Sequence, residues 1–577
     1  MASVVLIVAL LLGEGPDFVK LKASYMDALK TSKWREVRST ARAIAATGTR
    51  PALGFLNSEL KLAAEDTHRR ALFGAIALMK RPEVVEFLRS HASSGDPYFR
   101  AHAVKGLAAQ DPKKHFGLVV NLYDSDDDPR VRRVAIETLA AYKDEAAATT
   151  LLEGAAAIPV AEQQRVVRAL VGFDAEVLAK AAFAVLKGGD PEAQLVAMIA
   201  VSARASDKFA TVLDLGRQVK DRRVRLVATA GLERTKTPGQ SSTLRAMVKK
   251  AKSFDALWDL YDLIDRARLR DKILIDALKK GCTGGKTLLR PKAAQTYGRI
   301  AGADAVPLLA KLLHATKPWQ LPIGAARGLA ATRDGDAVEP LVAALERAER
   351  DGAQKSRLTL ELSMALESLT GQPFGLRADL WRRWWTERGT GFTIREIDEP
   401  LWEEETAAAD EYAFYGIQVR SQAVAFVCDV SGSMEGTKLD TLKTELSRFL
   451  KRFSATGRFN LIFFNDKVLP WKKRLVACKK KARHEALSHI DGLVAAGATN
   501  LWDALQAAMK DPAVDTIILL SDGSPTAGKI QALPKIRDTF TIENRARMVL
   551  VHVIAIEQDP RELREMANAS GGSYVTR

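Results

Sequence analysis

Near the C-terminus the sequence reads Ala425-Phe-Val-Cys-Asp429-Val-Ser431-Gly-Ser433-Met434, an apolar segment followed directly by Asp-x-Ser-x-Ser. Two further oxygen-bearing residues come later, Thr499 in Gly-Ala-Thr-Asn and Asp522 after the apolar run Ile-Ile-Leu-Leu-Ser. Each of the three clusters follows or adjoins a segment expected at the rim of a parallel sheet, so we expect them to converge. Two carboxylates and three hydroxyls at one place predict a site for a hard cation, Mg²⁺ or Mn²⁺.

The sequence around these clusters alternates between strand and helix patterns. We predict strands at 423–428, 459–464, 516–520 and 548–556, and helices at 438–453, 501–509 and 561–569. After the last helix, Gly571 and Gly572 predict a turn into a final edge strand. This order predicts an α/β domain with a doubly wound, mostly parallel sheet, in which ligands bind at the carboxyl ends of the strands.

With these residues in this order, 422–577 resembles a von Willebrand factor A (VWA) domain with a complete metal-ion-dependent adhesion site. The matching positions are Asp429, Ser431, Ser433, Thr499 and Asp522. The resemblance implies that Ser431 and Ser433 bind the metal directly, and that Thr499 binds it directly or through water. It implies that Asp429 and Asp522 act largely through bridging waters. It also implies that the metal keeps a position open for an Asp or Glu carboxylate of a protein partner.

A simpler interpretation of the first cluster is that its Ser and Asp side chains cap the helix beginning near Glu435, as these residue types often do. Capping does not account for Thr499 or Asp522. No candidate acid–base pair, no Gly-x-Ser-x-Gly turn and no His-Glu-x-x-His motif occurs. We therefore predict a protein that is not an enzyme, and we assign no catalytic residue.

A second pattern repeats through the first two-thirds of the chain. Asp96-Pro97-Tyr-Phe-Arg100-Ala-His-Ala103 recurs as Asp128-Pro129-Arg-Val-Arg132-Arg-Val-Ala135, and recurs more weakly at Asp190 and Asp221. The marker positions are Pro97, Pro129, Pro159, Pro191 and Arg222, at intervals of 32, 30, 32 and 31 residues. Two helices in about thirty residues, stacked on similar neighbours, predict an α-solenoid.

Each residue of the repeated pattern is expected to have a structural role in its unit. Asp can cap a helix start, and Pro suits the first turn. The Arg three residues after Pro is expected to reach back to the Asp of a neighbouring unit. The small central Ala lets the next helix approach closely. The pattern resembles HEAT repeats over roughly 20–390, which implies an extended interaction surface.

These patterns divide the chain into four parts. They are an apolar N-terminal segment (1–19), the HEAT-like array (20–390), an acidic linker (391–421) and the VWA-like domain (422–577). The linker is defined by eight acidic residues, Glu396, Asp398, Glu399, Glu403, Glu404, Glu405, Asp410 and Glu411.

The first part bears on localisation. Residues 4–13 (VVLIVALLLG) form an apolar run of signal-peptide length that is too short to span a bilayer. No Lys or Arg precedes it and no Ala-x-Ala site follows, so a buried first helix is the alternative. We predict an exported chain, periplasmic or extracellular, and otherwise a cytoplasmic one. No other stretch approaches membrane-spanning length.

Composition describes an ordinary folded protein with a basic surface. The 577 residues carry a formal net charge of +16, which favours an acidic partner such as nucleic acid or a protein with exposed carboxylates. Eight Lys and Arg residues crowd 467–483 around Trp471, either facing such a partner or forming a solvated hairpin and helix start. The three cysteines, Cys282, Cys428 and Cys478, have no zinc-binding spacing.

The sequence therefore predicts a non-enzymatic adhesion or scaffold protein. Its VWA-like domain would bind Mg²⁺ and an acidic side chain of a protein partner, and its HEAT-like array would supply extended surface. The alternative is an RNA-binding protein with an architecture similar to that of the Ro autoantigen, which also joins helical repeats to a VWA domain. The net charge favours that alternative, and the apolar N-terminus disfavours it.

Overall fold

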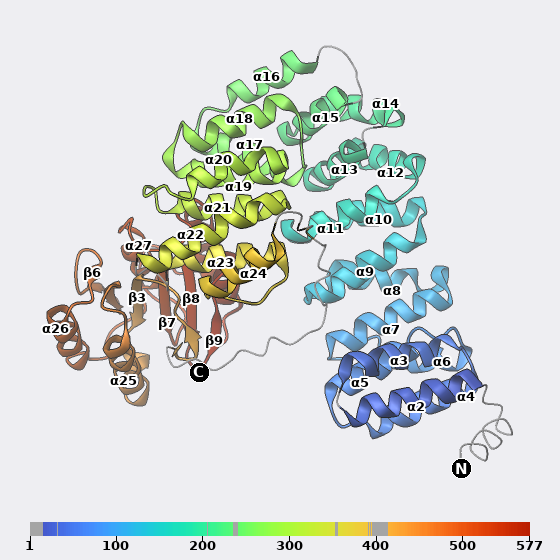
Figure 1. The fold of residues 1–577 in the computed structure, drawn as a ribbon, viewed down its shortest axis with the longest axis horizontal. Coiled ribbons are helices and arrows are strands. Elements are labelled where there is room, and N and C mark those ends of the chain that lie inside the picture. The colour runs from blue at the N-terminus through green and yellow to red at the C-terminus, as the bar shows by residue number, and fades with distance from the viewer. Residues whose placement is uncertain are drawn as a thin grey trace. The chain divides into compact units, whose positions relative to one another are not determined.

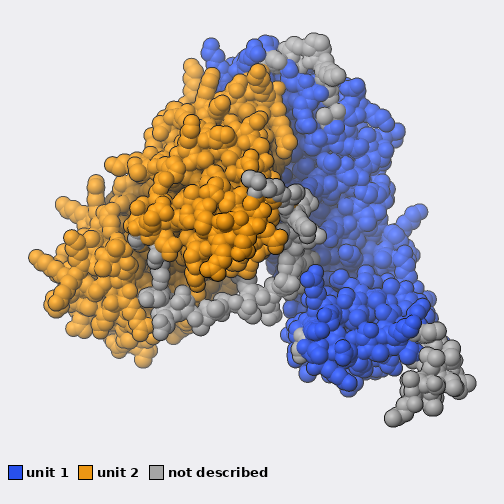
Figure 2. Space-filling view, in the orientation of Figure 1, with its two compact units in different colours: residues 1–250, 399–403 blue, residues 251–398, 404–577 orange. Residues whose placement is uncertain are grey.

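The computed structural model describes residues 16–31, 33–204, 206–234, 240–351, 356–389, 392, 394 and 413–577. The chain forms two compact units (Figure 2). The first comprises Met1–Lys250 with Glu399–Glu403, and the second comprises Ala251–Asp398 with Glu404–Arg577. The predicted signal segment at 4–13 and most of the predicted acidic linker lie outside the described residues. No described helix is long and apolar enough to cross a membrane.

The first unit is a stack of paired helices (Figure 1). They are α2 (Pro16–Lys30), α3 (Trp34–Ala46), α4 (Arg50–Leu62), α5 (Asp66–Ile76), α6 (Pro82–His91), α7 (Pro97–Gln110), α8 (Pro112–Ser125), α9 (Pro129–Tyr142), α10 (Glu145–Gly154), α11 (Val160–Val171), α12 (Ala175–Gly188), α13 (Pro191–Arg204), α14 (Ala210–Gln218), α15 (Arg222–Arg234) and α16 (Gln240–Lys250).

The Asp–Pro signal marks helix starts as predicted. The Asp96 carboxylate accepts a hydrogen bond of 2.8 Å from the Tyr98 backbone N–H, and Asp128 accepts one of 2.8 Å from Arg130. Each bond satisfies an amide that the helix itself leaves unpaired. The central alanines are buried as well, among them Ala103 and Ala135.

The repeat arginines reach in the opposite direction from the one we expected. Arg100 donates to both carboxylate oxygens of Asp126, at 2.9 and 3.0 Å, and Asp126 lies before the next unit rather than the preceding one. Arg132 likewise binds Glu162 of the following unit. Each guanidinium also donates to a carbonyl six residues upstream, those of Ser94 and Asp126. The arginines thus fix the loop that enters their own helix to the unit that follows.

The second unit continues the helical stack and then forms the sheet domain. Its stacked helices are α17 (Phe254–Arg266), α18 (Lys272–Thr283), α19 (Arg290–Ala301), α20 (Val306–Leu312), α21 (Gln320–Thr332), α22 (Val338–Arg350), α23 (Arg357–Thr370) and α24 (Ala378–Arg388). The closest approach is between α19 and α21, where a Cβ on Gly298 would lie 2.0 Å from the Gly328 carbonyl oxygen. Only glycine permits this contact.

The C-terminal domain is a seven-stranded sheet with helices on both faces. Its strands are β3 (Ala423–Asp429), β4 (Arg458–Phe464), β5 (Val468–Pro470), β6 (Val476–Ala477), β7 (Thr516–Ser521), β8 (Leu550–Ala555) and β9 (Tyr574–Thr576). The order is β5-β4-β3-β7-β8-β9, with β6 also on β4; β5 and β6 are antiparallel to β4 and the other pairs are parallel. The predicted fold class, helical repeats followed by a doubly wound sheet, is confirmed.

Helices cover each face of this sheet because its strands are apolar on both sides. One buried cluster includes residues of α25 (Thr437–Arg452) and α26 (Lys480–Asp491), and the other includes residues of α27 (Leu501–Met509), α28 (Leu533–Arg547) and α29 (Arg561–Ser570). A short hairpin of β1 (Ala413–Phe414) and β2 (Ile417–Gln418) precedes β3. The basic stretch at 467–483 forms β5, β6 and the start of α26.

Candidate metal site

The Asp-x-Ser-x-Ser cluster lies where β3 ends. Asp429 is the last residue of this strand and is completely buried. One of its carboxylate oxygens accepts a 2.9 Å hydrogen bond from the Ser431 backbone N–H, and the other accepts one of 2.7 Å from the Ser521 hydroxyl. The Ser431 and Ser433 hydroxyl oxygens are 3.1 Å apart. The loop therefore points three oxygen-bearing side chains toward the carboxyl end of the sheet.

Asp522 joins this cluster from the neighbouring strand. It follows β7, which pairs in parallel with β3, so both strands deliver their loops to the same edge. The Ser433 hydroxyl donates a 2.8 Å hydrogen bond to one carboxylate oxygen of Asp522. The Lys438 ammonium lies 2.8 Å from the other oxygen and 2.8 Å from Glu557.

A third loop brings Thr499 to the same edge. Gly432 N–H donates to the Gly497 carbonyl at 2.9 Å, which joins the Thr499 loop to the Asp-x-Ser-x-Ser loop. Thr499 is buried, and its backbone N–H donates to the Thr526 hydroxyl at 3.0 Å. Gly497 has φ +80°, and a Cβ there would lie 2.3 Å from a carboxylate oxygen of Asp466, so the turn requires glycine. The structure thus gathers all five predicted residues at the carboxyl end of the sheet.

These contacts decide against the helix-capping alternative. The N-cap of α25 is Gly436, which has no side chain to cap with, and Ser431 makes no side-chain capping bond to the short 3₁₀ turn Gly432–Met434. The polar side chains of the loop bond instead to one another, to Ser521 at the end of β7 and to Asp522 after it.

The side-chain oxygens of the site suit a cation. Burial raises the pKa of Asp429, and hydrogen bonds from Ser431 and Ser521 oppose that rise. The pKa of Lys438 is raised by its bonds to Asp522 and Glu557. All five predicted side chains offer oxygen, the donor that Mg²⁺ and Mn²⁺ prefer. Three of the five are hydroxyls and none is a Cys or His, the residues that bind zinc in structural sites.

Sequence reasoning missed three residues of the site: Ser521, Lys438 and Glu557. Ser521 directly precedes Asp522, and its hydroxyl could have been expected near the strand end. Lys438 lies in the first turn of α25, a position where acidic side chains are more common than basic ones, so the sequence did not mark it. No local signal marks Glu557, because only the parallel pairing of β7 with β8 brings it to this edge.

Comparison with known families supports both halves of the architecture. Residues 422–576 match the von Willebrand factor type A domain family. Residues 85–171 match HEAT repeats, and residues 322–347 match the PBS lyase HEAT-like repeat. The chain therefore carries a C-terminal VWA domain preceded by HEAT repeats.

Similarity to individual proteins is confined to part of the chain. Inter-alpha-trypsin inhibitor heavy chain H4 of Homo sapiens is 33% identical over 130 residues, which cover 20% of this chain and 14% of the relative. Heavy chain H2 of Sus scrofa is 35% identical over 162 residues, covering 26% and 17%. A solved structure, the von Willebrand factor type A protein from Catenulispora acidiphila, is 20% identical, covers 28% and 40%, and gives a TM-score of 0.25. The chain thus spans less than a fifth of the length of these two heavy chains.

Proposed function

We propose that this protein is a non-enzymatic, metal-dependent protein-binding scaffold. Its VWA domain would bind Mg²⁺ or Mn²⁺ and, through the metal, an Asp or Glu side chain of a protein partner. The observation that carries the proposal is the hydrogen-bonded chain from Ser431 through Ser433 to Asp522, which joins loops that are 89 residues apart in sequence. The similarity to inter-alpha-trypsin inhibitor heavy chains supports an interaction role.

In this proposal the neutral and the acidic side chains of the site have different roles. The neutral hydroxyls of Ser431, Ser433 and Thr499 would hold the ion, while Asp429 and Asp522 would act largely through water. A bound Mg²⁺ would present an electrophilic coordination position to an incoming carboxylate. Because few anionic groups would touch it directly, the ion would keep most of its charge for the partner. Ser521 holds Asp429 in place, and Lys438 holds Asp522.

The HEAT-like array would supply a second, extended surface, as solenoids do. We assign it to 20–390, the VWA domain to 422–577 and the connecting linker to 391–421. We also propose export to the periplasm or the extracellular space, with the cytoplasm as the alternative. The segment bounds and the localisation are inferred from the sequence patterns.

The direct test is thermal unfolding of the full chain in Mg²⁺ and in EDTA. We expect Mg²⁺ to raise the unfolding temperature, because a ligand at 100 times its Kd stabilises the folded state by about 2.7 kcal/mol. Asp429→Asn keeps the side chain's shape and should remove that response. The matched control is Asp440→Asn, an exposed carboxylate of α25 outside the site. A metal response that survives in Asp429→Asn would contradict the proposed site.

Partner binding needs a separate measurement. The purified chain is incubated with native extract, washed in Mg²⁺ and eluted with EDTA, and protein and RNA in the eluate are identified together. A protein released by EDTA from the wild type, and not retained by Asp429→Asn, supports metal-bridged binding. RNA that stays through EDTA and leaves with salt would instead favour the RNA-binding alternative.

A further inference from the structure

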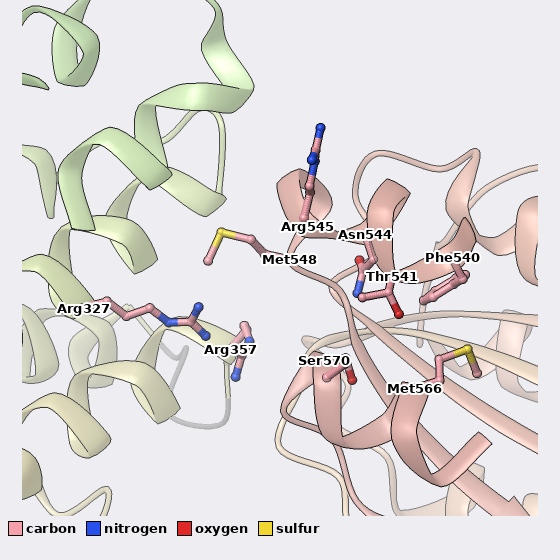
Figure 3. Close-up of a pocket in the computed structure, with 10 residues that line it drawn as sticks. Arg327, Arg357, Phe540, Thr541, Asn544, Arg545, Met548, Met566 and Ser570 are labelled. Carbon is pink, nitrogen blue, oxygen red and sulfur yellow. The ribbon is translucent and has the colours of Figure 1, made fainter. Parts of the chain in front are cut away.

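A small cavity of about 160 Å³ lies inside the second unit, between its repeat helices and the VWA domain (Figure 3). Arg327 of α21 and Arg357 of α23 line the repeat side. Thr541 and Asn544 of α28 and Ser570 of α29 line the VWA side. The walls of this cavity therefore come from two different parts of the unit.

Direct contacts join these two parts of the unit. The Gln320 side-chain amide donates to the Arg547 carbonyl at 3.1 Å, and the Trp319 indole donates to the Pro512 carbonyl at 3.0 Å. Arg545 pairs with Asp255 of α17 and lies over the Trp258 ring. These contacts make the cavity a defined feature of the unit.

Arg357 has an unused hydrogen-bond donor in this cavity. The residue is 5% exposed, and its Nε–H has no hydrogen-bond partner among the described residues. Its guanidinium forms an ion pair with Glu361 at 2.5 Å. Arg327 uses the same carboxylate through two hydrogen bonds of 2.8 and 2.6 Å, so two guanidinium groups share one negative charge.

Two further polar side chains that line the cavity have other partners. The Asn544 side-chain amide bonds to the Val549 backbone at 2.7 and 2.9 Å. The Ser570 hydroxyl donates to the Ala567 carbonyl at 2.7 Å and accepts from the Val551 N–H at 2.9 Å. Neither side chain compensates the charge of Arg357.

Two titratable groups of the VWA domain lie within electrostatic reach of Arg357. Asp515 accepts hydrogen bonds from the Ser421 and Thr516 hydroxyls, and no described ion pair joins it to Arg357. Burial, together with Arg357, lowers the pKa of His552 to about 4, so this imidazole is neutral at pH 7. Burial also lowers the pKa of Arg357, against the attraction of Glu361. Arg327 lowers the pKa of Arg357 further, and Asp515 opposes that change.

We propose that this cavity binds a small oxyanion, a phosphate, sulfate or carboxylate group, with Arg357 Nε–H as its principal donor. Arg327 supplies the second positive charge. The volume suits one small molecule, since a cavity of about 150 Å³ holds benzene. A bound anion would contact walls from both parts of the unit and would stabilise their junction.

The test is an anion titration of the full chain in EDTA, which keeps any metal away from the other site. Sodium phosphate, sulfate and acetate are added at constant ionic strength, and thermal unfolding is followed. We expect saturable stabilisation by at least one of them. Arg357→Met should weaken that binding about tenfold or more, as the loss of a charged hydrogen bond implies. Phosphate or sulfate as the effective anion indicates a free tetrahedral ligand, whereas acetate alone indicates a carboxylate.

The control separates binding from general salt effects, because sulfate and phosphate stabilise many proteins by exclusion from their surface. Arg382→Met removes a guanidinium that pairs with Glu339 and Glu346 away from the cavity, and it should respond as the wild type does. An equal response in Arg357→Met and the wild type overturns the proposal. If Arg357→Met does not fold, calorimetric titration of the wild type decides, and no binding up to about 10 mM of any of the three anions overturns it.

Discussion

The two ends of the VWA sheet both carry buried polar groups, but the groups come from different parts of the chain. At the carboxyl end, Asp429 comes from the end of β3 and Asp522 from the loop after β7, both in the VWA domain itself, and Ser433 is exposed to solvent. At the amino end, Asp515 precedes β7, and its charged neighbour Arg357 comes from a repeat helix. One end faces solvent, and the other is covered by the repeats.

Buried charged groups therefore have different roles at the two ends of the sheet. The carboxyl end concentrates negative charge next to hydroxyls and keeps an exposed edge, which suits binding of a cation and a partner. The amino end encloses two arginines with one glutamate and one aspartate, so its charges act on the stability of the junction. Substitutions at the covered end should therefore affect folding, and those at the open end should affect metal binding.

The largest effect is expected from Glu361→Gln. Glu361 is 4% exposed and pairs with both Arg327 and Arg357, so its neutral variant removes the carboxylate that both guanidinium groups contact. Removing one partner of a buried ion pair costs about 3–5 kcal/mol. We expect a loss of that size in the free energy of unfolding, measured by urea unfolding with tryptophan fluorescence.

The matched control for that change is Glu339→Gln. Glu339 also pairs with an arginine, Arg382, but its side chain is 51% exposed. Exposed pairs contribute about 0–1 kcal/mol, so this variant should be close to the wild type. Equal losses in the two variants would show that the covered end of the sheet has no special electrostatic role.

A smaller effect, visible through its pH dependence, is expected at Asp515. Burial raises the pKa of this carboxyl to about 6, against hydrogen bonds from Ser421 and Thr516. The folded chain therefore binds the proton more tightly than the unfolded chain, where Asp titrates near 3.9. The resulting stabilisation is complete below about pH 4 and is lost as the pH rises through about 6.

Between pH 7 and pH 5 the wild type should gain about 1.4 kcal/mol from this group, and Asp515→Asn should not. The measurement is urea unfolding of both proteins at the two pH values. Parallel pH dependence of the two would show that Asp515 has an ordinary pKa in the folded chain. Asp440→Asn, at the exposed start of α25, serves as the control and should retain the wild-type pH dependence.

The sequence predicted the open end of the sheet far better than the covered one. The apolar runs of β3 and β7, each followed by Asp, are local signals, and parallel pairing brings them together. The Asp-Pro caps of the repeats are equally local. Helix α28 was not predicted, because its segment is mostly polar and its buried side chains include only two large apolar ones, Ile536 and Phe540.

The covered end could not be predicted because its contacts are long-range. Arg357 lies at the first position of a repeat helix. Its neighbours lie in another part of the unit, Asp515 directly before β7 and His552 within β8. The partners of the repeat arginines could not be predicted for the same reason. The sequence identified Arg100 as a contact residue, but only the stacking of the units decides that it binds Asp126 ahead of it.

The smallest effect is expected from Lys438→Met, which tests whether a cation reaches the carboxyl end of the sheet. The ammonium bridges Asp522 and Glu557 at 2.8 Å each and is 20% exposed. In EDTA its loss should cost about 0.5–1 kcal/mol, because Asp522 then lacks a positive neighbour. In Mg²⁺ the loss should shrink, because a bound dication would take over the role of the ammonium and would no longer be repelled by it. Urea unfolding in the two buffers measures both values, and an equal loss in each would show that no cation reaches Asp522.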